Sequence, residues 1–264
     1  MFMMKFATRL VLASLLACAA SAQAGTISDV GNFAYWGGND HKLGDAIGGS
    51  LYDIQSATVT RDGDLLKILI NTNFAGHAGS APYAAPKGIG YGDVLLAAEW
   101  KPFGTDPHHL ADNARTGTKW SYGLNLDNRW SNTGGTFTLY ELNGATNAAN
   151  LYNSQDFMTC IMGSQCYYRD DQAVAVKTAS SSVRNTGLSG KWSVAANRSL
   201  QFDINIGTSN LANFDDLALH WGQTCQNDVI EGITDVPEPA TPALIGLALL
   251  GLALRRAART SSKG

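Results

Sequence analysis

The sequence lacks the short motifs that mark several large enzyme classes. It has no Gly-x-Ser-x-Gly nucleophile turn, no phosphate-binding glycine loop and no His-Glu-x-x-His zinc motif. It also lacks an apolar run of the roughly 20 residues that a membrane-spanning helix needs. Its two longest apolar runs, residues 10–20 and 242–254, contain 11 and 13 residues. These absences disfavour the corresponding catalytic sites and a conventional transmembrane helix.

The N-terminus has the order of a secretory signal peptide. Lys5 and Arg9 precede the first apolar run, and the small residues Ala22 and Ala24 follow it. A basic start, a short apolar core and small residues at the end are the features that signal peptidase reads. We therefore predict a signal peptide that ends at Ala24, so that the exported chain starts at Gly25.

The C-terminus has three elements in a fixed order: a proline-containing motif, the apolar run 242–254 and a basic cluster. The two prolines keep the motif out of a helix and leave it extended, and the arginines favour the cytoplasmic side of a membrane. The motif and the cluster consist of Val236, Pro237, Glu238, Pro239, Arg255, Arg256 and Arg259.

This arrangement resembles the PEP-CTERM sorting segment of Gram-negative bacteria. The resemblance implies recognition by an inner-membrane exosortase, cleavage near Pro-Glu-Pro, and delivery to the outer surface or to an exopolysaccharide matrix, with transient anchoring in the inner membrane. An uncleaved single-pass tail anchor is the alternative. The resemblance covers only about 25 residues and says little about the rest of the chain.

Residues 25–235, between the two segments, are acidic. They contain 13 Lys and Arg against 21 Asp and Glu, which gives a net charge of −8. Such a charge repels polyanions, so we expect no nucleic-acid partner. It is compatible with divalent cations or neutral sugars as ligands.

Apolar and polar residues alternate by twos in several stretches, which is typical of strands with one buried face. Asp62-Gly63 between two of them supplies the backbone conformation of a tight hairpin turn. We predict an all-β, antiparallel sandwich or jelly roll in a single domain over residues 25–235, between a signal peptide (1–24) and a sorting segment with a short hydrophobic helix (236–260). The predicted strands are 53–60, 65–72, 93–100, 120–126, 135–142, 173–178, 191–195, 200–206 and 217–221.

The four cysteines suit an exported protein. Cys160 and Cys166 flank a five-residue loop and are predicted to form a disulfide in an oxidising compartment. Cys225 is then an odd thiol, either buried and inert or bridging to a partner, and its pairing with the other two stays open. Cys18 lies in a stretch that resembles a lipobox, so its lipidation is an alternative to cleavage after Ala24.

Two polar clusters are candidate metal sites. Oxygen-bearing side chains around residues 215–231 could bind structural calcium; these are Asp215, Asp216, Asn227, Asp228 and Glu231. The alternative is a loop whose polar side chains cap their own backbone. A second group could bind a transition metal or form a polar surface loop; it contains Asp106, His108, His109 and Asp112. We expect no other cofactor.

Aromatic residues motivate a carbohydrate hypothesis, because flat rings can stack on sugar faces. Trp120 and Trp221 keep strand phase and are predicted to be core residues. The aromatic residues in apparent loops are Tyr35, Trp36, Trp100, Trp130, Tyr167 and Tyr168. We therefore predict a non-catalytic protein that acts by exopolysaccharide-associated or biofilm-associated binding or adhesion. The alternative is a secreted polysaccharide hydrolase with catalytic carboxylates among residues such as Glu99 and Glu141.

Overall fold

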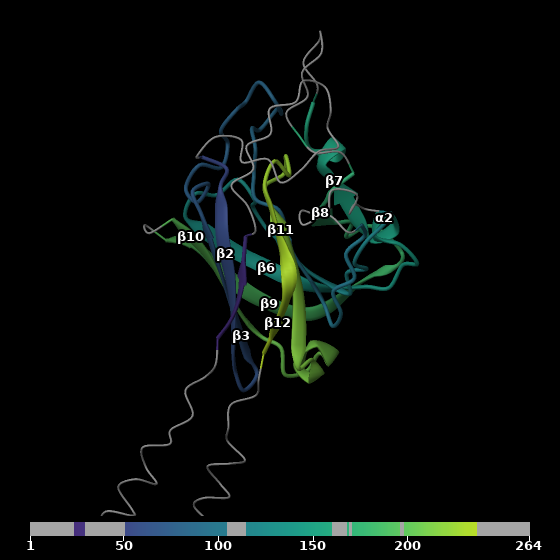
Figure 1. Cartoon of the computed structure of the whole chain (residues 1–264). Coiled ribbons are helices and arrows are strands. Elements are labelled where there is room, and N and C mark those ends of the chain that lie inside the picture. Colours follow the sequence, from purple (N-terminus) through teal and green to yellow (C-terminus); the bar gives the residue numbers. More distant parts are fainter. Residues whose placement is uncertain are drawn as a thin grey trace, which may run out of the picture.

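The computed structural model describes residues 24–29, 51–104, 115–159, 168, 171–195 and 198–236 (Figure 1). Within these ranges the chain is almost entirely β, which confirms the predicted fold class. The large-sheet strands are β1 (Gly25–Ser28), β2 (Ile54–Asp62), β3 (Leu65–Thr72), β4 (Val94–Ala97), β5 (Tyr122–Leu126), β6 (Gly134–Leu142), β9 (Val183–Ala195), β10 (Ser199–Asn205), β11 (Asp216–Gly222) and β12 (Val229–Asp235). The smaller elements are α2 (Asn147–Asn150), β7 (Leu151–Asn153), η1 (Ser154–Asp156), β8 (Ala173–Val176) and η2 (Asn210–Asn213).

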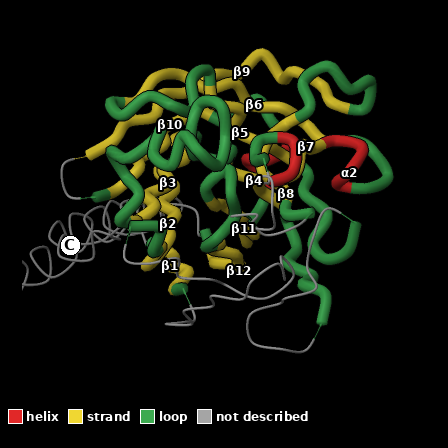
Figure 2. Tube along the Cα trace, turned by 90° about the horizontal axis from the view of Figure 1, so that it is seen from above, coloured by secondary structure: helices red, strands yellow, loops and turns green. Residues whose placement is uncertain are grey.

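The ten large-sheet strands form one antiparallel sheet in the order β1-β2-β3-β10-β9-β6-β5-β4-β11-β12. The β2–β3 hairpin turns at the predicted place, and Gly63 has the positive φ of 57° that the turn requires. Seen from above, the sheet curves round until its first and last strands are neighbours (Figure 2). The predicted sandwich-like core therefore lies between two halves of one continuous sheet.

Alternating residues of the strands fill this core. Leu66, Ile68 and Ile70 of β3 are buried, whereas Lys67 between them is exposed. Trp120 and Trp221 are also buried, as predicted from their strand phase. Burial of each large apolar side chain contributes roughly 1.5–3 kcal/mol, so the alternation fixes which face of each strand points inward.

A third layer covers part of the outer face. The small sheet β7–β8 lies over β4 and β5, and β4, β8 and most of β11 are buried on both faces. The buried Asp93 side chain joins the layers, because its Oδ2 accepts hydrogen bonds from Asn125 Nδ2 and Val176 N, each at 2.8 Å. Only one buried face was expected for residues 217–221, and the cover from β8 explains the second.

Several strands differ from the sequence prediction. β4 is shorter than the predicted 93–100, and β9 begins at Val183 instead of residue 191. β1 and β7 were not predicted, and β12 forms where a polar loop was expected. β12 pairs with β11 over its whole length, from Gly222 opposite Val229 to Asp216 opposite Asp235. In the described ranges no helix is long and apolar enough to cross a membrane. The apolar run 242–254 lies outside those ranges.

Candidate functional site

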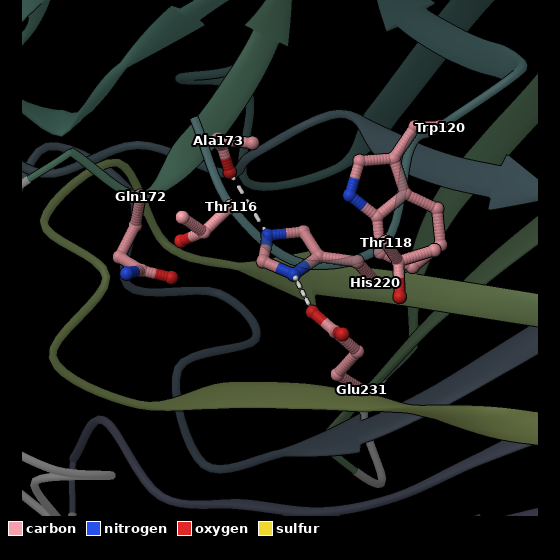
Figure 3. A pocket seen from close by; sticks show the side chains of 7 residues that line it. All are labelled: Thr116, Thr118, Trp120, Gln172, Ala173, His220 and Glu231. Atoms are coloured by element: carbon pink, nitrogen blue, oxygen red, sulfur yellow. Dashed lines mark hydrogen bonds and ion pairs between the residues drawn. The ribbon is translucent and has the colours of Figure 1, made fainter. Parts of the chain in front are cut away.

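A small polar pocket lies between the large sheet and β8 (Figure 3). β11 and β12 contribute His220 and Glu231, β8 contributes Ala173, and the segment before β5 contributes the threonines and Trp120. Its volume is about 10 Å³, the room that one water molecule needs. The lining residues are Thr116, Thr118, Trp120, Gln172, Ala173, His220 and Glu231.

Both ring nitrogens of His220 have partners in this pocket. Nδ1 lies 2.9 Å from Oε2 of Glu231, and Nε2 lies 2.9 Å from the Ala173 carbonyl oxygen. A carbonyl oxygen only accepts, so Nε2 carries a hydrogen. The other carboxylate oxygen of Glu231, Oε1, accepts the indole N–H of Trp100 at 2.8 Å. His220 therefore connects β11 to β8 and, through Glu231, to the segment after β4.

The geometry favours a structural link over acid–base chemistry. A general base needs a nitrogen within reach of its substrate, and the Ala173 carbonyl occupies Nε2 of His220. His220 is buried, and the pocket is far smaller than the roughly 300 Å³ at which small-molecule sites begin. It can hold a water molecule but not a sugar ring.

The five residues proposed as calcium ligands do not form one site. β11 and β12 are antiparallel, so Asp216 lies opposite Asp235 at one end of the ladder, whereas Asp228 precedes Val229 at the other end. Six residue steps of about 3.4 Å separate the two ends by about 20 Å. Glu231 lies between them and pairs with His220. In the described part of the chain, no group of three or more His, Cys, Asp or Glu side chains could hold a metal ion.

The acidic residues at the two ends of this ladder have different environments. The buried Asp228 accepts Ile54 N at 2.6 Å through Oδ2 and Val229 N at 3.0 Å through Oδ1, so it caps the backbone. Asp216 is exposed, and a hydrogen bond with Asp235 raises its pKa, helped by repulsion from the carboxylates of Asp235 and Asp215. The polar-capping alternative thus describes Asp228.

The loop aromatics that the structure describes are partly buried. The Trp130 ring has Lys87 Nζ 4.8 Å from its centroid, and its indole N–H donates to the Gly88 carbonyl at 3.1 Å. Trp100 donates to Glu231, and Tyr168 packs against the core. Tyr35, Trp36 and Tyr167 lie outside the described residues.

Three other aromatic side chains are exposed and were not predicted as candidates from the sequence. Tyr83, Phe103 and Tyr152 are 61 %, 53 % and 38 % exposed. Tyr83 and Phe103 each follow a proline directly, which is a signal for a loop position. Tyr152 follows the buried Leu151 on β7, so strand alternation places it outward.

Cys225 is a buried free cysteine, in agreement with the inert alternative. Burial raises the pKa of its thiol to about 12, so the nucleophilic thiolate is scarce at neutral pH. The predicted disulfide partners Cys160 and Cys166 lie outside the described residues, as do the candidate metal ligands Asp106, His108, His109 and Asp112.

The two candidate hydrolase carboxylates are both in ion pairs. Glu99 pairs with Lys101 in an exposed segment after β4. Glu141 on β6 pairs with Arg184 on β9. Neither lines the pocket around His220.

Two of the predicted processing sites border described strands. Ala24 is exposed and Gly25 begins β1. Val236 is buried, and its amide donates to the Asp215 carbonyl at 2.7 Å, so the described fold ends one residue before Pro237. The signal residue Ala22 and the motif residues Pro237, Glu238, Pro239, Arg255, Arg256 and Arg259 lie outside the described residues.

The comparison with protein families gives one match. Residues 235–257 match the PEP-CTERM protein-sorting motif, which is the segment identified in the sequence. No curated protein and no solved structure matches the chain significantly.

Proposed function

The chain carries a PEP-CTERM sorting segment and is thus an exported cell-envelope protein sorted by exosortase; from this premise we propose that its β domain is a non-catalytic module that binds neutral exopolysaccharide. It acts at the outer surface or in the extracellular matrix of a Gram-negative bacterium, after transient anchoring in the inner membrane through its C-terminal segment. The observation that carries the proposal is the sorting motif that follows β12 directly.

The polar interior supports binding over catalysis. The best candidate for an acid–base group, His220, has both ring nitrogens engaged in a pocket with room for one water. The carboxylates proposed for a hydrolase, Glu99 and Glu141, are neutralised by Lys101 and Arg184. Each of these three side chains is thus engaged by another protein group, which favours a binding role over catalysis for the domain.

The surface supports a neutral polysaccharide as ligand. The net charge of −8 over residues 25–235 repels acidic polymers and nucleic acids. Tyr83, Phe103 and Tyr152 expose aromatic rings, whose negative faces attract the polarised C–H groups of a sugar ring. Lys177 Nζ lies over the Tyr152 ring, 5.4 Å from its centroid, so a cationic hydrogen-bond donor covers one face of that ring.

The test is retention of the exported protein on exopolysaccharide purified from its host. We expect the wild-type protein to bind and a variant with Tyr83→Ala, Phe103→Ala and Tyr152→Ala to lose most of this retention. Ile233→Ala is the matched control, since Ile233 is 41 % exposed but not aromatic. Both variants are first shown to have the wild-type melting temperature.

Two other results would overturn the proposal. Loss of biofilm cohesion in a deletion strain, without any retention of the purified protein on the polysaccharide, identifies a structural protein instead. Release of new reducing ends from the polysaccharide identifies a hydrolase.

A further inference from the structure

The first strand of the fold packs on the last strand, where the sorting motif begins. A Cβ built on Gly25 would collide with the Thr234 side chain and come within 2.5 Å of the Asp235 carbonyl oxygen. The views in Figures 1 and 2 both place β1 beside β12. The start of β1 therefore lies against the last two residues of β12, and only a residue without a side chain fits there.

A second glycine, Gly232 of β12, brings the two strands together two residues further along each strand. A Cβ built on Gly232 would lie 2.8 Å from Cγ2 of Ile27, whose side chain is 6 % exposed. Gly232 thus opens the space into which Ile27 packs. Two glycines on facing strands, one in each, let β1 cover the end of β12 closely.

The end of β12 is consequently held from two sides. On one side Thr234 and Asp235 pair with Leu217 and Asp216 of β11. On the other side lies β1, and Val236 is fixed by its hydrogen bond to Asp215. A processing enzyme that cleaves near Pro237 must take several extended residues into its active site, so residues held in a sheet must first open locally.

We propose that β1 is a clasp that slows exosortase cleavage by holding the residues just before the Pro-Glu-Pro motif in the sheet. Cleavage of the folded chain then requires β1 to leave β12 and the end of β12 to fray from β11. This inference rests on exosortase processing of the chain and is independent of its polysaccharide ligand.

A disulfide between the two strands tests the clasp directly. A Cβ at position 232 lies 3.7 Å from Cβ of Ile27, within the range of about 3.5–4.5 Å for disulfides. The variant combines Ile27→Cys and Gly232→Cys in the full-length chain. The assay incubates this precursor with membranes that contain exosortase and follows cleavage by mass spectrometry, with and without reductant.

We expect the oxidised double variant to be cleaved at least about tenfold more slowly than the same protein after reduction, because a closed bond removes the open population. The wild-type chain with and without reductant is the control for its native cysteines. Gly25→Val should have the opposite effect and speed cleavage, since it forces β1 off Thr234. Thr26→Val is the matched control, because Thr26 is exposed on the same strand.

The outcomes distinguish the clasp from the sorting assignment. Equal rates for the oxidised and reduced double variant, with the wild-type chain cleaved, overturn the clasp and leave the sorting assignment intact. No cleavage of the wild-type chain in membranes that process another PEP-CTERM substrate overturns the sorting assignment itself. A melting curve of Gly25→Val shows whether the rest of the fold stays intact when β1 is displaced. If this variant is globally unfolded and the disulfide in the double variant has no effect on cleavage, the clasp is wrong.

Discussion

Glu231 faces His220 directly across the β11–β12 ladder, with its Oε2 2.9 Å from Nδ1 of the imidazole. Their side chains are 15 % and 3 % exposed. This pair gives the acidic residue in the middle of β12 a partner within the fold.

Replacing His220 by Ala should lower the free energy of unfolding by about 2–4 kcal/mol, because the change takes the imidazole away from the mostly buried Glu231 carboxylate and from the Ala173 carbonyl. Urea denaturation followed by tryptophan fluorescence measures the effect. Arg184→Ala is the control: its ion pair with Glu141 is 63 % exposed on the arginine side, so its loss should cost less than about 1 kcal/mol. Similar losses for both variants would contradict the structural role of His220.

Asp93→Ala should be more damaging than the His220 change. Besides Asn125 and Val176, the Asp93 carboxylate accepts hydrogen bonds from Arg129 Nη2 at 3.0 Å and Leu126 N at 3.1 Å. Its removal leaves the buried Arg129 guanidinium without its carboxylate counter-ion, and we expect a loss of about 3–5 kcal/mol in unfolding free energy.

The control for Asp93 is Asp62, the exposed last residue of β2. Asp62→Ala should change the unfolding free energy by no more than about 0.5 kcal/mol. An Asp93→Ala protein with the wild-type urea midpoint would show that β4, β5 and β8 hold together without this carboxylate.

Asp216→Asn should raise the melting temperature slightly at pH 7 and leave it unchanged at pH 3. The pKa of Asp216 is raised above its ordinary value of 3.8, first by the hydrogen bond with Asp235 and then by nearby carboxylates. A carboxyl with a higher pKa in the folded protein binds its proton more tightly there, so its contribution to stability is full below pH 3.8 and is lost as the pH rises through the raised pKa. An equal gain at both pH values would contradict this electrostatic origin; Asp62→Asn is the control.

Cys225 should resist alkylation in the folded protein. Its thiol is buried with a pKa of about 12, and only the thiolate reacts at an appreciable rate. Iodoacetamide at pH 8 should leave Cys225 unmodified in native protein and modify it fully in 6 M guanidinium, as peptide mass spectrometry can show. Rapid labelling of the native protein would place this thiol at the surface or in a frequently opened region.

The sequence predicted the strands with a strong local signal. Leu66, Ile68 and Ile70 alternate with less buried residues, and Gly63 marks the hairpin, so β2 and β3 were found almost residue for residue. β12 was missed because Asn227, Asp228 and Glu231 looked like a polar loop. The structural partners of these polar residues are His220 for Glu231 and the Ile54 amide for Asp228, which lie 11 and 174 positions away in the sequence.

The sequence by itself determined that the chain carries a sorting segment and an antiparallel β fold, because motifs and two-residue alternation are local properties of the chain. The tertiary structure alone decided which acidic residues meet: Asp216 pairs with Asp235, whereas Asp228 binds a backbone amide and Glu231 binds His220. It also decided that β8 buries the outer face of β11 and that Gly25 lies against Asp235. Strand order and layer contacts join residues up to about two hundred positions apart, and no local pattern encodes which of the compatible faces and edges come together.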